Sequence, residues 1–259
     1  MTKRIVSVFL AVLLLLSAAA FSEDTLYADI LERGNIVIAT EGTWAPWTYH
    51  DEDGTLVGFD VEVAQKIAEL LGVEAEFIDV EFDGILAGIA SGRFDISANG
   101  IEYSEDRAEA CELSAPYGYI HTALIVRDGD DRINTFEDLN GMKTANTLQS
   151  TYAALGEQYG AEVTGVDDLV QTMELLKAGR IDATLNADVS FYEYFTAQPD
   201  CGLHVAALTQ DASLVVIPMA KGEVSLKAAI DDAIAQLMAD GTIAEISIKY
   251  FGSDITKAE

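Results

Sequence analysis

Short apolar segments alternate with helical patterns along this chain, and the alternation limits the fold more than any other feature. Residues 36–40 (IVIAT) form a β-branched apolar run that is typical of a buried strand. Residues 61–71 then place apolar side chains at helical spacing, with Asp60 expected as the N-cap. Further strands are predicted at 75–80 and 94–98, and a short helix at 82–91. Such alternation predicts an α/β unit with a mostly parallel sheet covered by helices.

The same pattern begins again near residue 143. Strands are predicted at 143–146, 162–164, 181–185 and 213–218, and helices at 150–159, 167–178, 189–196, 225–238 and 242–250. No low-complexity linker separates the two halves, and no internal repeat is visible. We therefore predict two α/β lobes that are joined by short crossings near 122–126 and 208–213.

Residues 1–22 have the pattern of a secretory signal peptide. Two cationic side chains precede the apolar run 5–16, and small residues follow it. This run is too short to span a bilayer comfortably. We expect cleavage after Ala20 or Ser22 and a soluble, exported protein, with the bacterial periplasm as the expected compartment.

The charge of the chain excludes several kinds of partner. Asp and Glu number 44 against 15 Lys and Arg, which gives a formal net charge of −29. Nucleic acids and anionic lipids both require clustered cations, so neither is expected as a partner. Half of the residues are hydrophobic, and the charges are dispersed, which predicts a folded chain.

Neither the cysteines nor the histidines form a recognisable metal or disulfide pattern. Cys111 and Cys201 lie far apart in segments assigned to different lobes, so we expect them to be unpaired. His50, His121 and His204 have no His or Cys neighbours at ligand spacing. The sequence therefore predicts no bound metal and no cofactor.

Four stretches of the chain resemble one known family. They are residues 40–47 (TEGTWAPW), 58–64 (GFDVEVA), 95–107 (DISANGIEYSEDR), and 237–242 with 249–252 (LMADGT and KYFG). Together they resemble the polar-amino-acid family of ABC-transporter solute-binding proteins. The resemblance implies a two-lobed type II periplasmic-binding-protein fold, with residues 23–121 and 212–259 in lobe 1 and 122–211 in lobe 2. It also implies a monomeric receptor without enzymatic activity, which delivers an amino acid to a membrane ABC permease.

The resemblance also implies which residues bind the ligand carboxylate. Arg107 occupies the position of the family's carboxylate-binding Arg, and its planar guanidinium can bond both carboxylate oxygens. Backbone groups and small side chains would complete this part of the site, namely Asn99, Gly100, Ser150 and Thr151. Gln149 stands where the family has Gly, so this loop departs from the family's pattern.

Aromatic side chains would form the walls of the cleft. Trp44 and Phe82 match wall positions of the family. Core packing is an alternative role for Phe82. Trp47 is expected to support the loop from beneath.

The residue that pairs the ligand ammonium is less clear from the pattern. Ala187 occupies the position where the family usually has Asp, and Asp188 follows it directly. Glu102 is the alternative partner, unless it forms an internal ion pair with Arg107 or faces solvent. Glu41 matches an acidic position that faces the side chain of basic ligands in related receptors. These carboxylates favour cystine or a cationic amino acid as the ligand.

Two other functions are compatible with the pattern. Some relatives of this fold are periplasmic dehydratases of cyclohexadienyl acids, and Glu102 beside Arg107 would be a candidate general acid or base. A sensor lobe of a membrane receptor is less expected, because the sequence ends at Glu259 without a membrane span.

Overall fold

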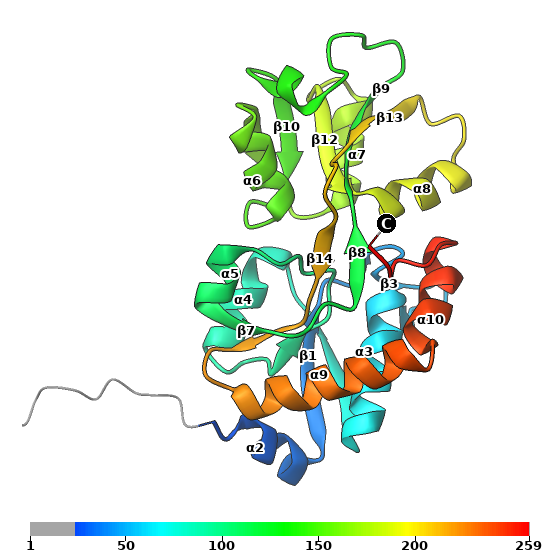
Figure 1. Cartoon of the computed structure of the whole chain (residues 1–259). Coiled ribbons are helices and arrows are strands. Elements are labelled where there is room, and N and C mark those ends of the chain that lie inside the picture. The colour runs from blue at the N-terminus through cyan, green and yellow to red at the C-terminus, as the bar shows by residue number, and fades with distance from the viewer. Residues whose placement is uncertain (1–23, 259) are drawn as a thin grey trace, which may run out of the picture.

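The computed structural model describes residues 24–258, which form two α/β lobes, one above the other in Figure 1. The predicted signal peptide, residues 1–22, lies outside the described residues. The sheet of the first lobe has the strand order β5 (Glu74–Asp79), β1 (Asn35–Thr40), β6 (Ile96–Ser97), β15 (Pro218–Ala220) and β7 (Cys111–Leu113). β1 runs parallel to both of its neighbours, whereas β15 is antiparallel. The predicted mixed, mostly parallel sheet is therefore present.

Helices cover both faces of this first sheet, which explains why the central residues 36–39 of β1 are all apolar. They are α2 (Leu26–Arg33), α3 (Phe59–Leu71), the 3-10 turn η1 (Phe82–Gly84) with α4 (Ile85–Ala90), α5 (Glu105–Ala110), α9 (Val224–Ala239) and α10 (Thr242–Phe251). The chain returns to this lobe at its C-terminal end, where α9 packs across α3. A small sheet of β2 (Thr43–Trp44), β3 (Thr48–His50) and β4 (Leu56–Val57) lies at the side of the lobe that faces its neighbour.

The sheet of the second lobe combines parallel and antiparallel pairs. Its order is β11 (Glu162–Gly165), β10 (Lys143–Asn146), β12 (Ala183–Ala187), β9 (Thr122–Arg127) and β13 (Leu203–Leu208), with η2 (Phe136–Leu139), α6 (Thr151–Gln158), α7 (Leu169–Lys177) and α8 (Asp188–Ala197) around it. β10 is parallel to β11 and β12, whereas β9 is antiparallel to β12 and β13. The carboxyl ends of β10 and β11 point toward the first lobe, because α6 and α7 begin there.

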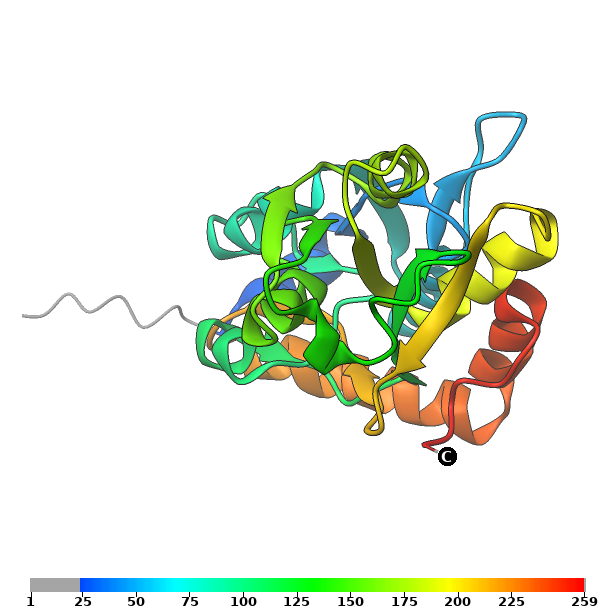
Figure 2. The same cartoon turned by 90° about the horizontal axis from the view of Figure 1, so that it is seen from above.

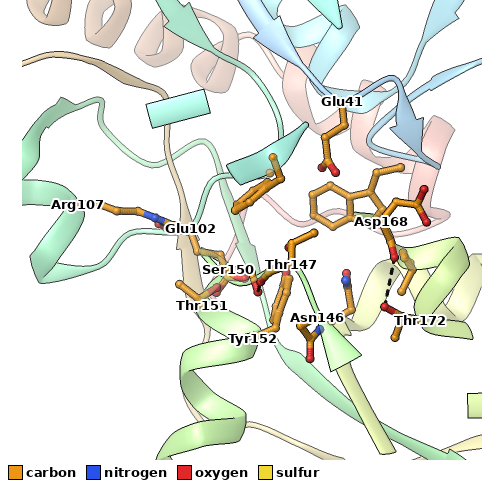
Figure 3. Close-up of a pocket in the computed structure, with 15 residues that line it drawn as sticks. Glu41, Glu102, Arg107, Asn146, Thr147, Ser150, Thr151, Tyr152, Asp168 and Thr172 are labelled. Atoms are coloured by element: carbon orange, nitrogen blue, oxygen red, sulfur yellow. Dashed lines mark hydrogen bonds between the residues drawn. The ribbon is translucent and has the colours of Figure 1, made fainter. Parts of the chain in front are cut away.

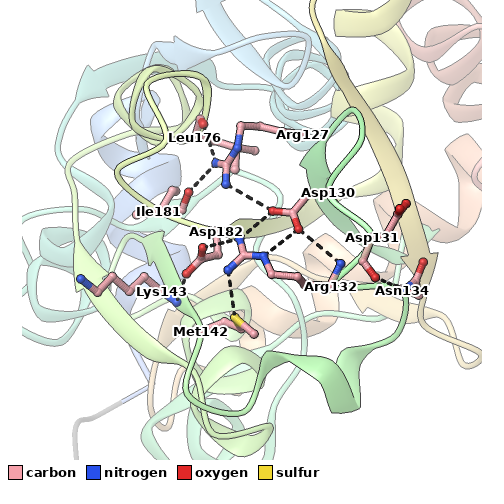
Figure 4. A network of polar contacts seen from close by, with 10 residues as sticks. All are labelled: Arg127, Asp130, Asp131, Arg132, Asn134, Met142, Lys143, Leu176, Ile181 and Asp182. Carbon is pink, nitrogen blue, oxygen red and sulfur yellow. Dashed lines mark hydrogen bonds and ion pairs between the residues drawn. The ribbon is translucent and has the colours of Figure 1, made fainter.

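An ion-pair network holds the end of the second lobe that lies away from the first (Figure 4). Arg132 bonds Asp130 and Asp182 at 2.7 and 2.8 Å. Arg127 donates to the backbone carbonyls of Leu176 and Ile181 at 2.8 and 2.6 Å. These contacts tie β9 to the α7–β12 connection and so stiffen the sheet that carries the site residues of this lobe.

The chain crosses between the lobes on two neighbouring strands. β8 (Gly118–Ile120) and β14 (Ser213–Val215) form an antiparallel pair in which Ser213 lies opposite Ile120. The backbone N–H of Tyr119 also donates to the Ile255 carbonyl at 2.7 Å, so the C-terminal segment packs on the crossing. Beside it, α8 of the second lobe lies against α10 of the first (Figures 1 and 2). The fold is thus the two-lobed type II arrangement; the residue limits given above for each lobe remain a prediction.

Several local predictions need correction. Gly58, not Asp60, is the N-cap of α3, and Asp60 lies fully buried in the first turn. The carboxylate of Asp60 accepts hydrogen bonds from the Tyr117 hydroxyl, at 2.7 Å, and from the Gly100 backbone. These two buried donors, and not solvent, therefore explain the acidic residue at this position. The strand predicted at 213–218 is two strands, β14 and β15.

The two cysteines are unpaired, as expected. Cys111 is buried in β7 of the first lobe, and Cys201 is half-buried in the second. In the described part of the chain, no helix is both long and apolar enough to cross a membrane.

Candidate functional site

A cavity lies between the two lobes and is the main candidate for a functional site (Figure 3). It encloses about 470 Å³, including the solvent at its mouth. The first lobe contributes Glu41, Trp44, Phe82, Gly100, Glu102 and Arg107 to its walls. The second lobe contributes mainly the ends of β10 and β12 and the beginnings of α6 and α7. A concave site with aromatic walls and a few convergent polar groups is typical of small-molecule binding.

Eight of the ten predicted site residues line this cavity. They are Glu41, Trp44, Phe82, Gly100, Glu102, Arg107, Ser150 and Thr151. Asn99 and Asp188 are the two that do not, and each has a structural role of its own.

Asn99 is fully buried behind the wall and holds Glu41 in place. Its side-chain oxygen accepts from the Glu41 backbone at 2.8 Å and from the Thr48 hydroxyl at 3.1 Å. Its amide donates to the Glu41 carboxylate at 2.7 Å. Asn99 therefore positions Glu41.

Asp188 begins α8 and is engaged by backbone groups. Its carboxylate accepts from the N–H groups of His121 and Val189 at 3.2 and 2.9 Å. Burial raises its pKa, and these two hydrogen bonds oppose that shift. Asp188 thus fastens α8 to the start of β9, and the structure does not bring it to the cavity.

Gly100 and Trp44 pack against each other so closely that no side chain fits between them. Gly100 has a φ of +55°, and a Cβ built on it would lie 2.6 Å from the Trp44 ring. Trp44 stacks on Trp47 with ring centroids 5.2 Å apart. Trp47 is fully buried, and its indole N–H donates to the Ser190 hydroxyl of the second lobe at 2.9 Å. Trp44 is therefore a cavity wall, and Trp47 supports it.

Arg107 is buried at one end of the cavity. Its guanidinium donates to the backbone carbonyl of Glu102 at 2.7 Å and to that of Gln149, in the second lobe, at 2.9 Å. It also lies 5.9 Å from the centre of the Phe82 ring, a cation–π distance. Burial lowers its pKa, and the Glu102 carboxylate opposes this shift. A fixed, desolvated guanidinium of this kind is suited to binding a carboxylate.

Gln149 joins the two lobes at this end of the cavity. Its backbone N–H donates to the Asp83 carboxylate at 3.0 Å, and its side-chain amide donates to the Asp83 carbonyl at 3.0 Å. The loop with Gln149 in place of Gly therefore adopts a shape that reaches the first lobe. With the Trp47–Ser190 bond on the other side, the lobes are closed over the cavity.

Ser150 caps the helix that points at the cavity. Its hydroxyl accepts from the Ala153 N–H at 3.0 Å and donates to the Thr147 carbonyl at 2.7 Å. Thr151 is the first residue of α6. The free N–H groups of this helix start are ready donors for an anion.

Four polar atoms of the lining are buried without a protein partner in the described residues. They are Trp44 Nε1, Glu102 Oε1, Asn146 Oδ1 and the Tyr152 hydroxyl. Buried polar groups in native proteins are nearly always hydrogen-bonded. Their concentration in one cavity indicates that a polar ligand completes their bonding.

Several other second-lobe residues of the lining were not predicted from the sequence. Asn146 is the last residue of β10 and Thr147 follows it, at the carboxyl end of a parallel strand, where ligands gather in α/β sheets, so this signal was available. Asp168 caps α7 by accepting from the Gln171 N–H at 2.8 Å, and it lines the cavity as well. Within residues 24–258, no three His, Cys, Asp or Glu side chains are grouped as a metal site.

Two α/β lobes joined by paired crossing strands, and closed over a cavity with a buried Arg, define the class of bilobal solute-binding proteins. The chain belongs to the bacterial extracellular solute-binding proteins, family 3, whose family model matches residues 36–253.

Relatives that are named as amino-acid-binding or cystine-binding proteins are similar to this chain over nearly its whole length. A probable amino-acid ABC transporter-binding protein of Haemophilus influenzae is 37% identical over 248 residues, 94% of this chain and 96% of the relative. The L-cystine-binding protein TcyJ of Escherichia coli is 33% identical, over 93% of this chain and 92% of the relative.

Solved structures support the same family. An ancestral arginine-binding protein bound to arginine has a TM-score of 0.79 at 33% identity and covers 85% of this chain and 99% of its own. The L-cystine solute receptor of Neisseria gonorrhoeae, in an unliganded open conformation, has a TM-score of 0.61 at 36% identity. This match covers 90% of this chain and 99% of the receptor. The lower score against an open form agrees with the interlobe bonds described above. The ancestral amino acid-binding protein AncCDT-1, a precursor of cyclohexadienyl dehydratase, has a TM-score of 0.79 at 25% identity. This match covers 87% of this chain and 98% of the ancestral protein.

Proposed function

We propose that this protein is an extracytoplasmic receptor that captures an amino acid between its lobes and delivers it to an ABC permease. The observation that carries the proposal is the closed interlobe cavity, with one buried guanidinium and four partnerless polar atoms. In this proposal the protein acts as a monomer in the periplasm, without cofactor or metal.

Each charged group of an amino acid has a partner in the cavity. Arg107 and the start of α6 bind the carboxylate, because both present fixed donors there. Glu102 binds the ammonium, since it is 3% exposed, lines the cavity and has the Tyr152 hydroxyl beside its carboxylate. Burying either ligand charge alone would be costly, so both partners are needed.

The remaining walls suit a partly aliphatic side chain. Trp44 and Phe82 present aromatic surfaces, and Glu41 adds a carboxylate beyond them. Cystine or a cationic amino acid fits this combination, and relatives named for cystine and for arginine are compatible with both.

The direct test uses protein that has been unfolded, dialysed and refolded to remove any bound ligand. Calorimetric titration with the common amino acids and cystine is expected to yield one strong binder. Mass spectrometry of ligand released from the untreated protein identifies the natural one. Failure of every amino acid to bind would refute the proposal.

Replacing Arg107 tests the mode of binding. Loss of one partner of a buried charge pair costs about 2–5 kcal/mol, so Arg107→Ala should weaken binding by roughly a hundredfold or more. Lys66→Ala, an exposed change on α3, is the control and should bind normally. Calorimetry measures both, and wild-type affinity in Arg107→Ala would remove this residue from the site.

A dehydratase on this fold is the second candidate, because Glu102 is a buried carboxyl with a free oxygen beside the carboxylate-binding end of the cavity. Incubation with prephenate or arogenate separates the two functions. A receptor leaves both acids intact, whereas an enzyme releases their aromatic products and loses this activity in Glu102→Gln.

A further inference from the structure

The segment that follows α10 returns to the strands that cross between the lobes. Gly252 ends α10 with a φ of +71°, which only glycine adopts readily, and so turns the chain back. Residues 253–256, which we call the C-terminal strap, then run to β8, and in Figure 1 the red end of the chain lies beside this strand. The Ile255 carbonyl accepts from the Tyr119 N–H at 2.7 Å. The strap is therefore bonded directly to one of the two crossing strands.

Hydrogen bonds of its own hold the strap in one shape. The buried hydroxyl of Ser247, in α10, accepts from the Ile255 N–H at 3.0 Å and donates to the Ser253 carbonyl at 2.6 Å. The Asp254 carboxylate accepts from the N–H and the hydroxyl of Thr256 at 3.0 and 2.6 Å, which is a turn that Asp favours. The strap is thus an ordered link between α10 and β8.

The Ile255 side chain is buried over the crossing strands. It is 5% exposed and belongs to the same apolar cluster as Val215 of β14. A Cβ built on Gly118 of β8 would lie 2.9 Å from Ile255 Cδ1 and 3.5 Å from Val215 Cβ. Gly118 therefore leaves the space that Ile255 fills, and the strap packs on both crossing strands at this point.

Val215 leads from this contact to the ligand cavity. It pairs with Gly118 on one side and forms an antiparallel bridge with Glu102 on the other. The backbone carbonyl of Glu102 in turn accepts from the Arg107 guanidinium at 2.7 Å. Only the strands β8 and β14 thus separate the strap from two charged residues of the cavity.

We infer that the C-terminal strap, through Ile255, is a positioning element of the binding site and controls ligand affinity from outside the cavity. None of the four strap residues is part of the cavity lining. In the proposed function, on which this inference rests, Glu102 and Arg107 bind the amino acid. Ile255 positions them through the packing at Gly118 and Val215, because a densely packed interior transmits a local displacement to its neighbours.

The strap also stabilises the closed arrangement of the lobes. The helix that carries Ser247, α10, lies against α8 of the second lobe beside the crossing strands (Figures 1 and 2). The strap fixes this helix to β8, so α10 meets α8 in a defined position when the lobes close. Without the strap this contact should favour the closed form less, and a ligand that requires closure should bind more weakly.

Ile255→Ala tests the inference against a matched control. Ile30→Ala removes the same atoms from a fully buried Ile on α2, at the end of the first lobe that points away from the second (Figure 1). The probe is the amino acid, among the common ones and L-cystine, that ligand-free wild type binds most tightly in the titration described above. Circular dichroism establishes a temperature at which both variants are folded, and calorimetry then measures their affinities.

The two variants should both melt below wild type, and only Ile255→Ala should lose affinity. The expected loss is about threefold or more, as for other changes that act on a site through packed neighbours. Ligand dissociation, followed by stopped-flow tryptophan fluorescence, should become faster in Ile255→Ala, because closure holds the ligand in place. Destabilisation of the first lobe alone would not separate Ile255→Ala from Ile30→Ala in either measurement.

Two milder variants keep the test decisive if Ile255→Ala does not fold. Ile255→Val removes one methyl group from the same packing. Ser247→Ala removes the hydroxyl that joins α10 to the strap and leaves every cavity residue in place. Both should bind more weakly than wild type, and hydrogen exchange of the Tyr119 amide should be faster in Ser247→Ala.

The outcomes separate this inference from the proposed function. Wild-type affinity in the strap variants, or an equal loss of affinity in Ile30→Ala, would overturn the role of the strap and leave the receptor function intact. If wild type binds no amino acid at all, the receptor function itself fails.

Discussion

At the scale of single residues, the motifs located the first-lobe half of the cavity well. Arg107, Gly100 and Trp44 could be predicted because each has a chemical or steric reason for its type, and the structure places all three on the cavity. Asn99 and Asp188 do not line the cavity, and the sequence could not show this, because positions next to the site do not reveal which neighbours they bond.

Glu102 and Asp188 are the two candidates for the ligand ammonium, and one pair of variants distinguishes them. Glu102→Gln keeps the size and removes the charge from the cavity, so affinity should fall by about tenfold or more. Asp188→Asn should instead lower the melting temperature, because the carboxylate anchors backbone groups of His121 and Val189. Calorimetry and thermal unfolding measure the two effects; the reverse pattern would assign the ammonium to Asp188.

Asp60 should make stability depend on pH. Burial raises its pKa from 3.8 to about 7, against the lowering effect of the Tyr117 and Gly100 hydrogen bonds. The folded protein therefore holds a proton that the unfolded chain releases, so this group destabilises the fold increasingly as pH rises from about 4 to 7.

Asp60→Asn removes that dependence but leaves one of the two donors badly paired, at a cost of about 1–3 kcal/mol. The variant should be less stable than wild type at pH 5, and the difference should narrow at pH 8. Urea unfolding at both pH values measures it. A difference that stays constant would mean that Asp60 is ionised throughout.

At the scale of elements, long segments with a clear hydrophobic period could be predicted from the sequence, whereas very short strands could not. The strand at 143–146 and the helices α9 and α10 were found within a residue or two. β7 and β8 have only three residues each, which is too short for a recognisable period, and they form through pairing with distant strands. The helix predicted at 61–71 ends at Leu71 as expected, and Gly72 forms its left-handed C-cap.

The loop before α6 should contribute to closure through Gln149. Gln149→Ala removes the side-chain bond to the Asp83 carbonyl, which only the closed form can make. One neutral hydrogen bond contributes about 0.5–1.5 kcal/mol, so affinity should fall by roughly two- to tenfold.

Gln158→Ala is the matched control, since Gln158 is exposed at the end of the same helix. Calorimetry with the cognate amino acid compares the two variants. Equal affinity of Gln149→Ala and wild type would show that this contact adds nothing to closure.

At the scale of the whole molecule, the repeated strand–helix alternation predicted two lobes, but not how they face each other. The interlobe contacts of Trp47 with Ser190, and of Asp83 with Gln149, join residues that are distant in the chain and carry no shared pattern. Asp168 could not be predicted as a site residue for the same reason, because the residues that it meets across the cavity depend on how the lobes are oriented.

A ligand gripped by both lobes should shift the population toward the closed form. At a thousandfold excess over Kd, it stabilises the folded protein by about 4 kcal/mol, which corresponds to a rise on the order of 10 °C in Tm. Thermal unfolding and small-angle scattering test this, with a smaller radius of gyration expected on binding. A ligand that raises Tm without compaction would argue against closure as the response.

The paired crossing strands have a consequence for evolution and engineering. The chain crosses out of the first lobe on β8 and back on β14, and Ile120 of β8 lies opposite Ser213 of β14 in one ladder. The second lobe is thus topologically a single insertion whose two attachment points adjoin. Recombination between relatives at the paired strands β8 and β14 could exchange the whole insertion without disturbing the core of the first lobe. Asp168 and the loop before α6 would be exchanged with it. New specificities could then arise by replacing half of the binding cleft in one event.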